Sequence, residues 1–223
     1  SMAGRLKLIG STKKTGPVIE ASFERFVTLL NAHLEHHLFI FGGHPSVADF
    51  ALAGQLIQLM MDEKPGSFIR EKAPFVSAWC EFMEDPRQGA PFEPLEALAP
   101  TLLPLIRDEV AETYVAWCLE NTASIGKKRK TVTVDMPGGE YKQGVQSHTA
   151  AAFATLQEQF ASQAETPAAS ALLENAGLGE VFDFAPAKAP IAEVVSDSSE
   201  AEEDVPVVPD EPAPSEGAET KSE

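Results

Sequence analysis

The stretch over residues 42–61 constrains this chain most, because a glycine pair and a proline there precede an almost uninterrupted apolar run. Ser46 and Asp49 stand three residues apart at the head of the run, which is the spacing of a helix N-cap and a reciprocal acidic partner. The polar side chains within residues 47–61 are Asp49, Gln55 and Gln58. A helix that is apolar almost all round is expected at the centre of a helical bundle, and this one is too short to span a bilayer.

Further helices are expected on both sides of this stretch, so the predicted fold class is mainly α. Apolar residues recur at helical spacing through residues 19–37 and 95–124, which predicts two long amphipathic helices. Shorter helices are expected at 67–72 after a turn at 62–66, from residue 74, from residue 147 with Ser147 as its cap, and at 167–175.

Two segments after residue 126 depart from the helical pattern. Residues 131–135 alternate, residues 136–139 are rich in turn formers, and a β-hairpin packed on the helices is therefore predicted near 130–143. Residues 185–223 lack aromatic side chains and are rich in Pro, Ala and acidic residues, which predicts a disordered acidic tail. The expected organisation is a lead-in at 1–18, a helical domain at 19–184 and a tail at 185–223.

Charge and cysteine usage limit the classes of partner. Residues 191–223 carry eleven acidic side chains and one basic one, a net charge of −10 out of −17 for the chain, and the rest is mildly acidic. An acidic body argues against a nucleic-acid partner, and the basic run at 127–130 is expected to be a solvated loop. Cys80 and Cys118 lie in apolar helical patterns, which favours free thiols and a cytoplasmic location. The sequence contains no recognisable signal peptide or membrane span.

Motifs that would carry chemistry on their own are missing from the sequence. It has no phosphate loop, no nucleophile elbow and no Cys-x-x-Cys, and the capping role accounts for Asp49. His33 and His37 are one helical turn apart, a spacing that can bind a metal, but no Cys, Asp or Glu completes a set. We therefore expect no catalytic residue and no metal, and these histidines, together with His36, are interpreted as part of a solvated helix end.

Residues 41–50 read Phe-Gly-Gly-His-Pro-Ser-Val-Ala-Asp-Phe, and this motif resembles the C-terminal helical domain of the glutathione S-transferase superfamily. The resemblance extends over about residues 19–160. It implies that Ser46 and Asp49 form the folding-critical capping box of the central buried helix. It also implies a hydrophobic pocket for the acceptor substrate, for which Tyr114 and Trp117 are the candidate substrate-binding residues. Packing in the core is the alternative role for both.

In proteins of this superfamily, a thioredoxin-like domain binds glutathione and activates its thiol, and no segment of this sequence matches that domain. The resemblance leaves two functions open. The chain is either the helical half of an enzyme that conjugates glutathione, its co-substrate, to electrophilic small molecules, or a non-catalytic scaffold of the same ancestry. Under both readings we expect exposed apolar faces along residues 19–37 and 95–124, covered by a thioredoxin-like domain, another protein or self-association.

Overall fold

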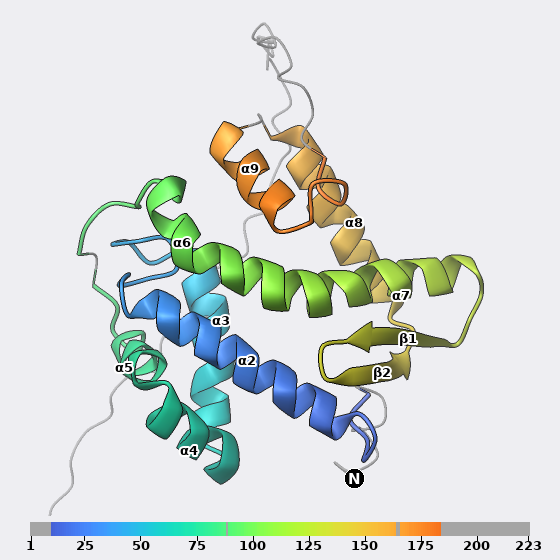
Figure 1. Ribbon diagram of the computed structural model, residues 1–223, viewed down its shortest axis with the longest axis horizontal. Coiled ribbons are helices and arrows are strands. Elements are labelled where there is room, and N and C mark those ends of the chain that lie inside the picture. The colour runs from blue at the N-terminus through green and yellow to red at the C-terminus, as the bar shows by residue number, and fades with distance from the viewer. Residues whose placement is uncertain (1–9, 88, 164–165, 184–223) are drawn as a thin grey trace, which may run out of the picture. The chain divides into compact units, whose positions relative to one another are not determined.

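The computed structural model describes residues 10–87, 89–163 and 166–183, all of which belong to one unit of the chain, Ser1–Lys188. These residues form a mainly helical structure with one two-stranded sheet, which confirms the predicted fold class (Figure 1). The predicted disordered tail at 185–223 and the first nine residues of the predicted lead-in lie outside the described residues. The division into lead-in, helical domain and tail stays a prediction.

The helices in the first part of the structure are α2 (Gly16–Leu34), α3 (Val47–Met60), α4 (Glu63–Lys72) and α5 (Pro74–Phe82). They are followed by α6 (Leu95–Leu105), η1 (Ile106–Val115) and α7 (Ala116–Gly126), which run on as one continuous ribbon in Figure 1. The hairpin strands are β1 (Thr131–Met136) and β2 (Gly139–Gly144), and the last helices are α8 (Ser147–Ser162) and α9 (Pro167–Asn175).

Helix α2 lies in the first core of the molecule, where it packs against α4, α5, α6, η1 and the strand β2. Its apolar stripe is fully buried at Val27 and Leu30, which join a core made with side chains of α3 to α6. Because one amphipathic face meets neighbours along its whole length, α2 organises the first core of the molecule.

The predicted place of residues 47–61 at the centre of the bundle is wrong. Helix α3 packs against α4 and α5, and only Asp49, Ala53 and Leu56 on it are buried. Its other face carries apolar side chains into solvent, with Val47 86 % and Phe50 54 % exposed, and Met61 at its end is 83 % exposed. The sparse polar residues of α3 therefore reflect two apolar faces, one on the core and one without a covering element among the described residues.

Two local predictions also fail. The segment 62–66, predicted as a turn, forms the N-cap and first turn of α4. Proline is tolerated there because the N–H groups of the first helical turn have no intrahelical acceptor, so the N–H that proline lacks costs no hydrogen bond. Gly66 lets α4 approach the end of α3 closely, since a Cβ atom there would lie 2.5 Å from the carbonyl oxygen of Met60. Ser147 begins α8 but does not cap it, and the N-cap residue is Gln146 without a side-chain cap.

The middle of the long helix departs from α geometry. Residues 106–115 are wound as a π-helix, within the stretch 95–124 that the sequence predicted as one long helix that contains Pro100 and Pro104. Both prolines lie within α6, before the π segment begins. Stretches of π-helix are rare in proteins, and those that occur are often found at functional sites. The side chains of η1 are therefore candidates for a functional role.

A second core lies between the long helix, the hairpin and α8. The strands pair antiparallel from Thr131 opposite Gly144 to Met136 opposite Gly139, and β1 packs on α7. Val132 and Val134 point inward from β1, while Phe153 of α8 meets Phe182, which follows α9. In the described part of the chain, no helix is long and apolar enough to cross a membrane.

Candidate functional site

A cavity of about 480 Å³ opens where the start of α2, the junction of η1 and α7, and the hairpin meet. Its lining comes from Val18, Ile19 and Ser22 of α2, Thr113, Tyr114 and Trp117 of the long helix, Met136, Tyr141 and Gln143 of the hairpin, and Ser11. The surface of the cavity is mostly apolar with a few hydroxyl groups. This volume and lining are typical of a site for a small organic molecule.

The hairpin closes one side of the cavity because its turn packs on the start of α2. A two-residue turn connects Met136 to Gly139, and Gly138 and Gly139 both have positive φ, at 106° and 133°, which favours glycine. A Cβ atom on Gly139 would lie 3.4 Å from Val18 Cγ2. Lys14 Nζ lies 2.6 Å from Glu140 Oε1, which ties the segment before α2 to the hairpin.

Both residues predicted to bind substrate, Tyr114 and Trp117, line this cavity. Trp117 is 8 % exposed, and its indole N–H is buried with no hydrogen-bond acceptor among the described residues. Tyr114 is about half exposed and packs edge to face on Phe153, with ring centroids 6.5 Å apart. Burial, together with the neighbouring Cys118 thiol, raises the pKa of Tyr114, so its hydroxyl is neutral near pH 7.

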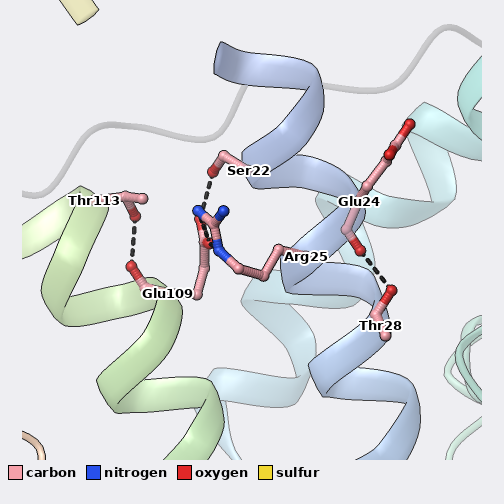
Figure 2. A network of polar contacts seen from close by, with 6 residues as sticks. All are labelled: Ser22, Glu24, Arg25, Thr28, Glu109 and Thr113. Carbon is pink, nitrogen blue, oxygen red and sulfur yellow. Dashed lines mark hydrogen bonds and ion pairs between the residues drawn. The ribbon is translucent and has the colours of Figure 1, made fainter. Parts of the chain in front are cut away.

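Behind the cavity wall lies an ion pair between α2 and η1, shown in Figure 2. Glu109 is 4 % exposed, and its Oε2 accepts from Arg25 Nε at 2.5 Å, with Arg25 Nη2 also 2.5 Å away. Its Oε1 accepts from the Ser22 hydroxyl, and its backbone carbonyl accepts from Thr113 Oγ1 at 2.7 Å. Ser22 and Thr113 thus belong both to the ion-pair network and to the cavity lining.

Ser22, Arg25 and Glu109 were not predicted as site residues from the sequence. Ser22 and Arg25 are three residues apart and share one side of α2, which is visible in the sequence. Their partner Glu109 is 84 residues from Arg25, and no local pattern links the two helices. One signal was available in the sequence, which is the position of Glu109 among the apolar residues of a predicted helix. An acidic side chain at such a position is expected to be paired, since buried acidic residues are rare otherwise.

Ser46 and Asp49 form the reciprocal cap at the start of α3. Ser46 Oγ accepts from the Asp49 N–H at 3.5 Å, and Asp49 Oδ2 accepts from the Ser46 N–H at 2.8 Å. Asp49 is fully buried, and its Oδ1 accepts from the N–H of Ile40 at 2.8 Å. The pair therefore holds the loop before α3 as well as the helix end, and it is remote from the cavity in the structure.

The interpretation of His33, His36 and His37 as a solvated helix end holds for His36, which is exposed, and is wrong for His33. His33 is fully buried, and its Nε2 donates to the carbonyl of Ile40 at 2.9 Å, so its Nδ1 accepts from the Thr101 hydroxyl at 2.8 Å. His37 Nδ1 lies 3.0 Å from Glu93 Oε2. His33 is buried because Ile40, in the loop after α2, and Thr101 of α6 contact its ring nitrogens, and Thr101 is 68 residues away in the sequence.

Among the described residues, no group of three or more His, Cys, Asp or Glu side chains could hold a metal ion. Cys80 and Cys118 are free and buried, and burial raises the pKa of Cys80 to about 11 and also raises that of Cys118. Neither thiol is therefore prepared to act as a nucleophile at neutral pH.

Comparison with known proteins gives one match. Residues 17–82 match the family model described as "Glutathione S-transferase, C-terminal domain". No curated protein and no solved structure was found to match the chain. The matched segment covers α2 to α5, including the capping pair, and ends before the helix that carries Glu109, Tyr114 and Trp117.

Proposed function

Residues 17–82 have the fold of the glutathione S-transferase C-terminal helical domain, and from this premise we propose that the chain is the acceptor-substrate half of a glutathione S-transferase-like protein. In this proposal the 480 Å³ cavity receives an apolar, electrophilic small molecule. A thioredoxin-like domain would supply the glutathione site and the thiolate. The described residues contain one two-stranded sheet and so do not themselves include that domain.

The observation that carries the proposal is the convergence of Tyr114 and Trp117 on one cavity. Both were selected from the sequence as aromatic residues with polar tips, and both line a space of the size that small-molecule sites have. Tyr114 and Trp117 come from the long helix, whereas Val18 and Ile19 come from α2, so the site requires the folded tertiary structure.

Tryptophan fluorescence tests this proposal, because the chain has two tryptophans and only Trp117 lines the cavity. Trp79 lies in the first core and serves as the matched control. A neutral nitroaromatic compound should quench the emission of the Trp79→Phe variant saturably and leave that of the Trp117→Phe variant unchanged. Equal quenching of both variants, or none in either, would contradict a ligand site at the cavity.

A second candidate function is a non-catalytic interaction scaffold, which the exposed apolar face of α3 favours. Val47, Phe50 and Met61 leave there an apolar surface that a thioredoxin-like domain, another protein or a second copy of the chain would cover. The two most exposed large apolar side chains among the described residues, Val47 and Met61, thus lie at the two ends of α3, while Ile19 and Tyr114 are partly exposed on the two helices where apolar faces were predicted.

Light scattering over a range of concentrations distinguishes these cases. Self-association through α3 should be weakened by Phe50→Glu and left intact by Phe75→Glu, since Phe75 is also partly exposed but lies on α5. A monomer at all concentrations would contradict self-association. Immobilised glutathione should not retain the chain in either case, because we assign glutathione binding to the thioredoxin-like domain.

A cytoplasmic location is part of the proposal. Its support is the pair of free, buried cysteines, which suits a reducing compartment.

A further inference from the structure

Two aliphatic hydroxyl groups of the lining, Ser22 on α2 and Thr113 on η1, share one property, which is that each already donates its hydrogen to the protein. Ser22 donates to the Glu109 carboxylate, and Thr113 donates to the Glu109 backbone carbonyl at 2.7 Å. Each hydroxyl has one hydrogen and two acceptor lone pairs. Toward a molecule in the cavity, Ser22 and Thr113 can therefore only accept.

The ion pair behind the wall keeps Ser22 in this role. Glu109 is buried and held by Arg25 at 2.5 Å, so a carboxylate oxygen faces Ser22 and only a donor satisfies it. A hydroxyl that donates to a carboxylate also becomes a better acceptor, because hydrogen bonds in a chain polarise one another. The charges of Arg25 and Glu109 compensate each other, so this wall does not favour an anionic or a cationic ligand.

Other polar groups of the lining are not restricted to accepting, because the Gln143 side chain carries amide hydrogens and the half-exposed Tyr114 hydroxyl has a hydrogen of its own. The Tyr141 hydroxyl donates to the Gln143 side-chain oxygen at 3.0 Å. Ser11 precedes α2 in the chain, and its hydroxyl can rotate to either role. The Trp117 N–H is a donor, but the nitrogen is buried within the protein and is not at the cavity surface.

We propose that the cavity selects neutral apolar molecules that carry a hydrogen-bond donor, such as an aromatic hydroxyl or N–H group, which Ser22 and Thr113 accept. This inference rests on the proposed function, because it concerns the molecules that the same cavity binds. It goes further by assigning Ser22 and Thr113 as specificity-determining residues. They favour ligands that carry a hydrogen-bond donor over ligands that differ only in lacking one.

A matched pair of ligands tests the inference. 1-Naphthol carries a donor, and 1-methoxynaphthalene keeps the ring and the oxygen but lacks the donor. Calorimetric titration of the full chain should give a dissociation constant about five-fold lower for naphthol, the worth of one net hydrogen bond. Equal affinities, or tighter binding of the ether, would overturn the inference while leaving the cavity as a ligand site. If neither compound binds, the proposed function fails as well.

Variants locate the effect. The double variant Ser22→Ala, Thr113→Val should reduce the naphthol preference to about one, while binding of the ether changes little. Thr28→Val is the control, because Thr28 Oγ1 donates to the Glu24 carbonyl at 2.7 Å just as Thr113 does to the Glu109 carbonyl (Figure 2). Thr28 is not part of the cavity lining. A preference that persists in Thr113→Val and in the double variant would contradict the assignment.

Discussion

The carboxylate of Asp49 accepts the backbone N–H of Ile40 at 2.8 Å, nine residues before it and outside the helix that Asp49 caps. Its other oxygen accepts the N–H of Ser46 at 2.8 Å. One buried side chain therefore holds both the helix start and the loop that approaches it. Asp49 therefore contributes more to the stability of the fold than a residue that only caps a helix.

Replacing Asp49 should therefore destabilise the fold more than replacing its capping partner. Asp49→Ala leaves two N–H groups without their acceptor, and we expect the free energy of unfolding to fall by about 3 kcal/mol. Ser46→Ala removes one cap interaction and should lower it by about 1 kcal/mol. Denaturant unfolding of the two variants measures both values. Equal losses would show that the bond to Ile40 contributes nothing.

Two glycines on either side of the cap should respond to alanine in opposite directions. Gly42 has φ of 102°, and a Cβ atom there would lie 2.7 Å from the backbone nitrogen of Glu93, so Gly42→Ala should destabilise by more than 1 kcal/mol. Gly54 lies in α3 with open space around its Cα, so Gly54→Ala should stabilise by about 0.5–1 kcal/mol. Thermal unfolding of both variants gives the sign, and a shared sign would contradict this account.

His33 should make the stability of the fold depend on pH. Burial lowers the pKa of His33, and His37 lowers it further, against the raising effects of the Ile40 carbonyl, Asp49 and Glu93. Above about pH 6.5, the ordinary value, His33 is neutral in both states and its contribution is fully present. Below that pH the unfolded chain takes up a proton first, so stability falls by at most about 1.4 kcal/mol per pH unit until the folded pKa is reached.

The measurement is denaturant unfolding at pH 7.5 and 5.5 for the unmodified chain and for His33→Gln. The variant removes this titration, so its stability should change less between the two pH values. A variant with the same pH dependence as the unmodified chain would contradict a role for His33.

The cysteines should be unreactive in the folded protein. Burial raises the pKa of Cys80 to about 11, so at pH 8 roughly one thiol in a thousand is ionised, and the side chain is 2 % exposed. Burial also raises the pKa of Cys118. We expect iodoacetamide at pH 8 to label neither residue in the native chain and both in denaturant, as detected by mass spectrometry. Rapid native labelling of Cys80 would exclude the packing described here.

Local spacing in the sequence was sufficient to predict the elements that depend on neighbouring residues. The pairing of Ser46 with Asp49 spans one helical turn, and the turn at Gly138 and Gly139 needs a positive φ that glycine adopts most readily. The helical spacing of apolar residues over 19–37 predicted an amphipathic helix, and α2 buries Val27, Leu30 and Leu34 of that stripe. Each of these patterns acts within a few residues, so the chain order alone contains it.

Only the tertiary structure decided which surfaces meet. The sequence indicated that α3 is apolar but not that half of it faces outward, because burial depends on which elements lie beside it. The Ser22 and Arg25 contacts to Glu109 join residues more than 80 positions apart, and the burial of His33 depends on Thr101, 68 positions away. Tyr114 and Trp117 were visible as aromatic residues on a helix, but their shared cavity exists only because the hairpin folds back on α2. Such contacts depend on the packing of distant segments, which no local pattern encodes.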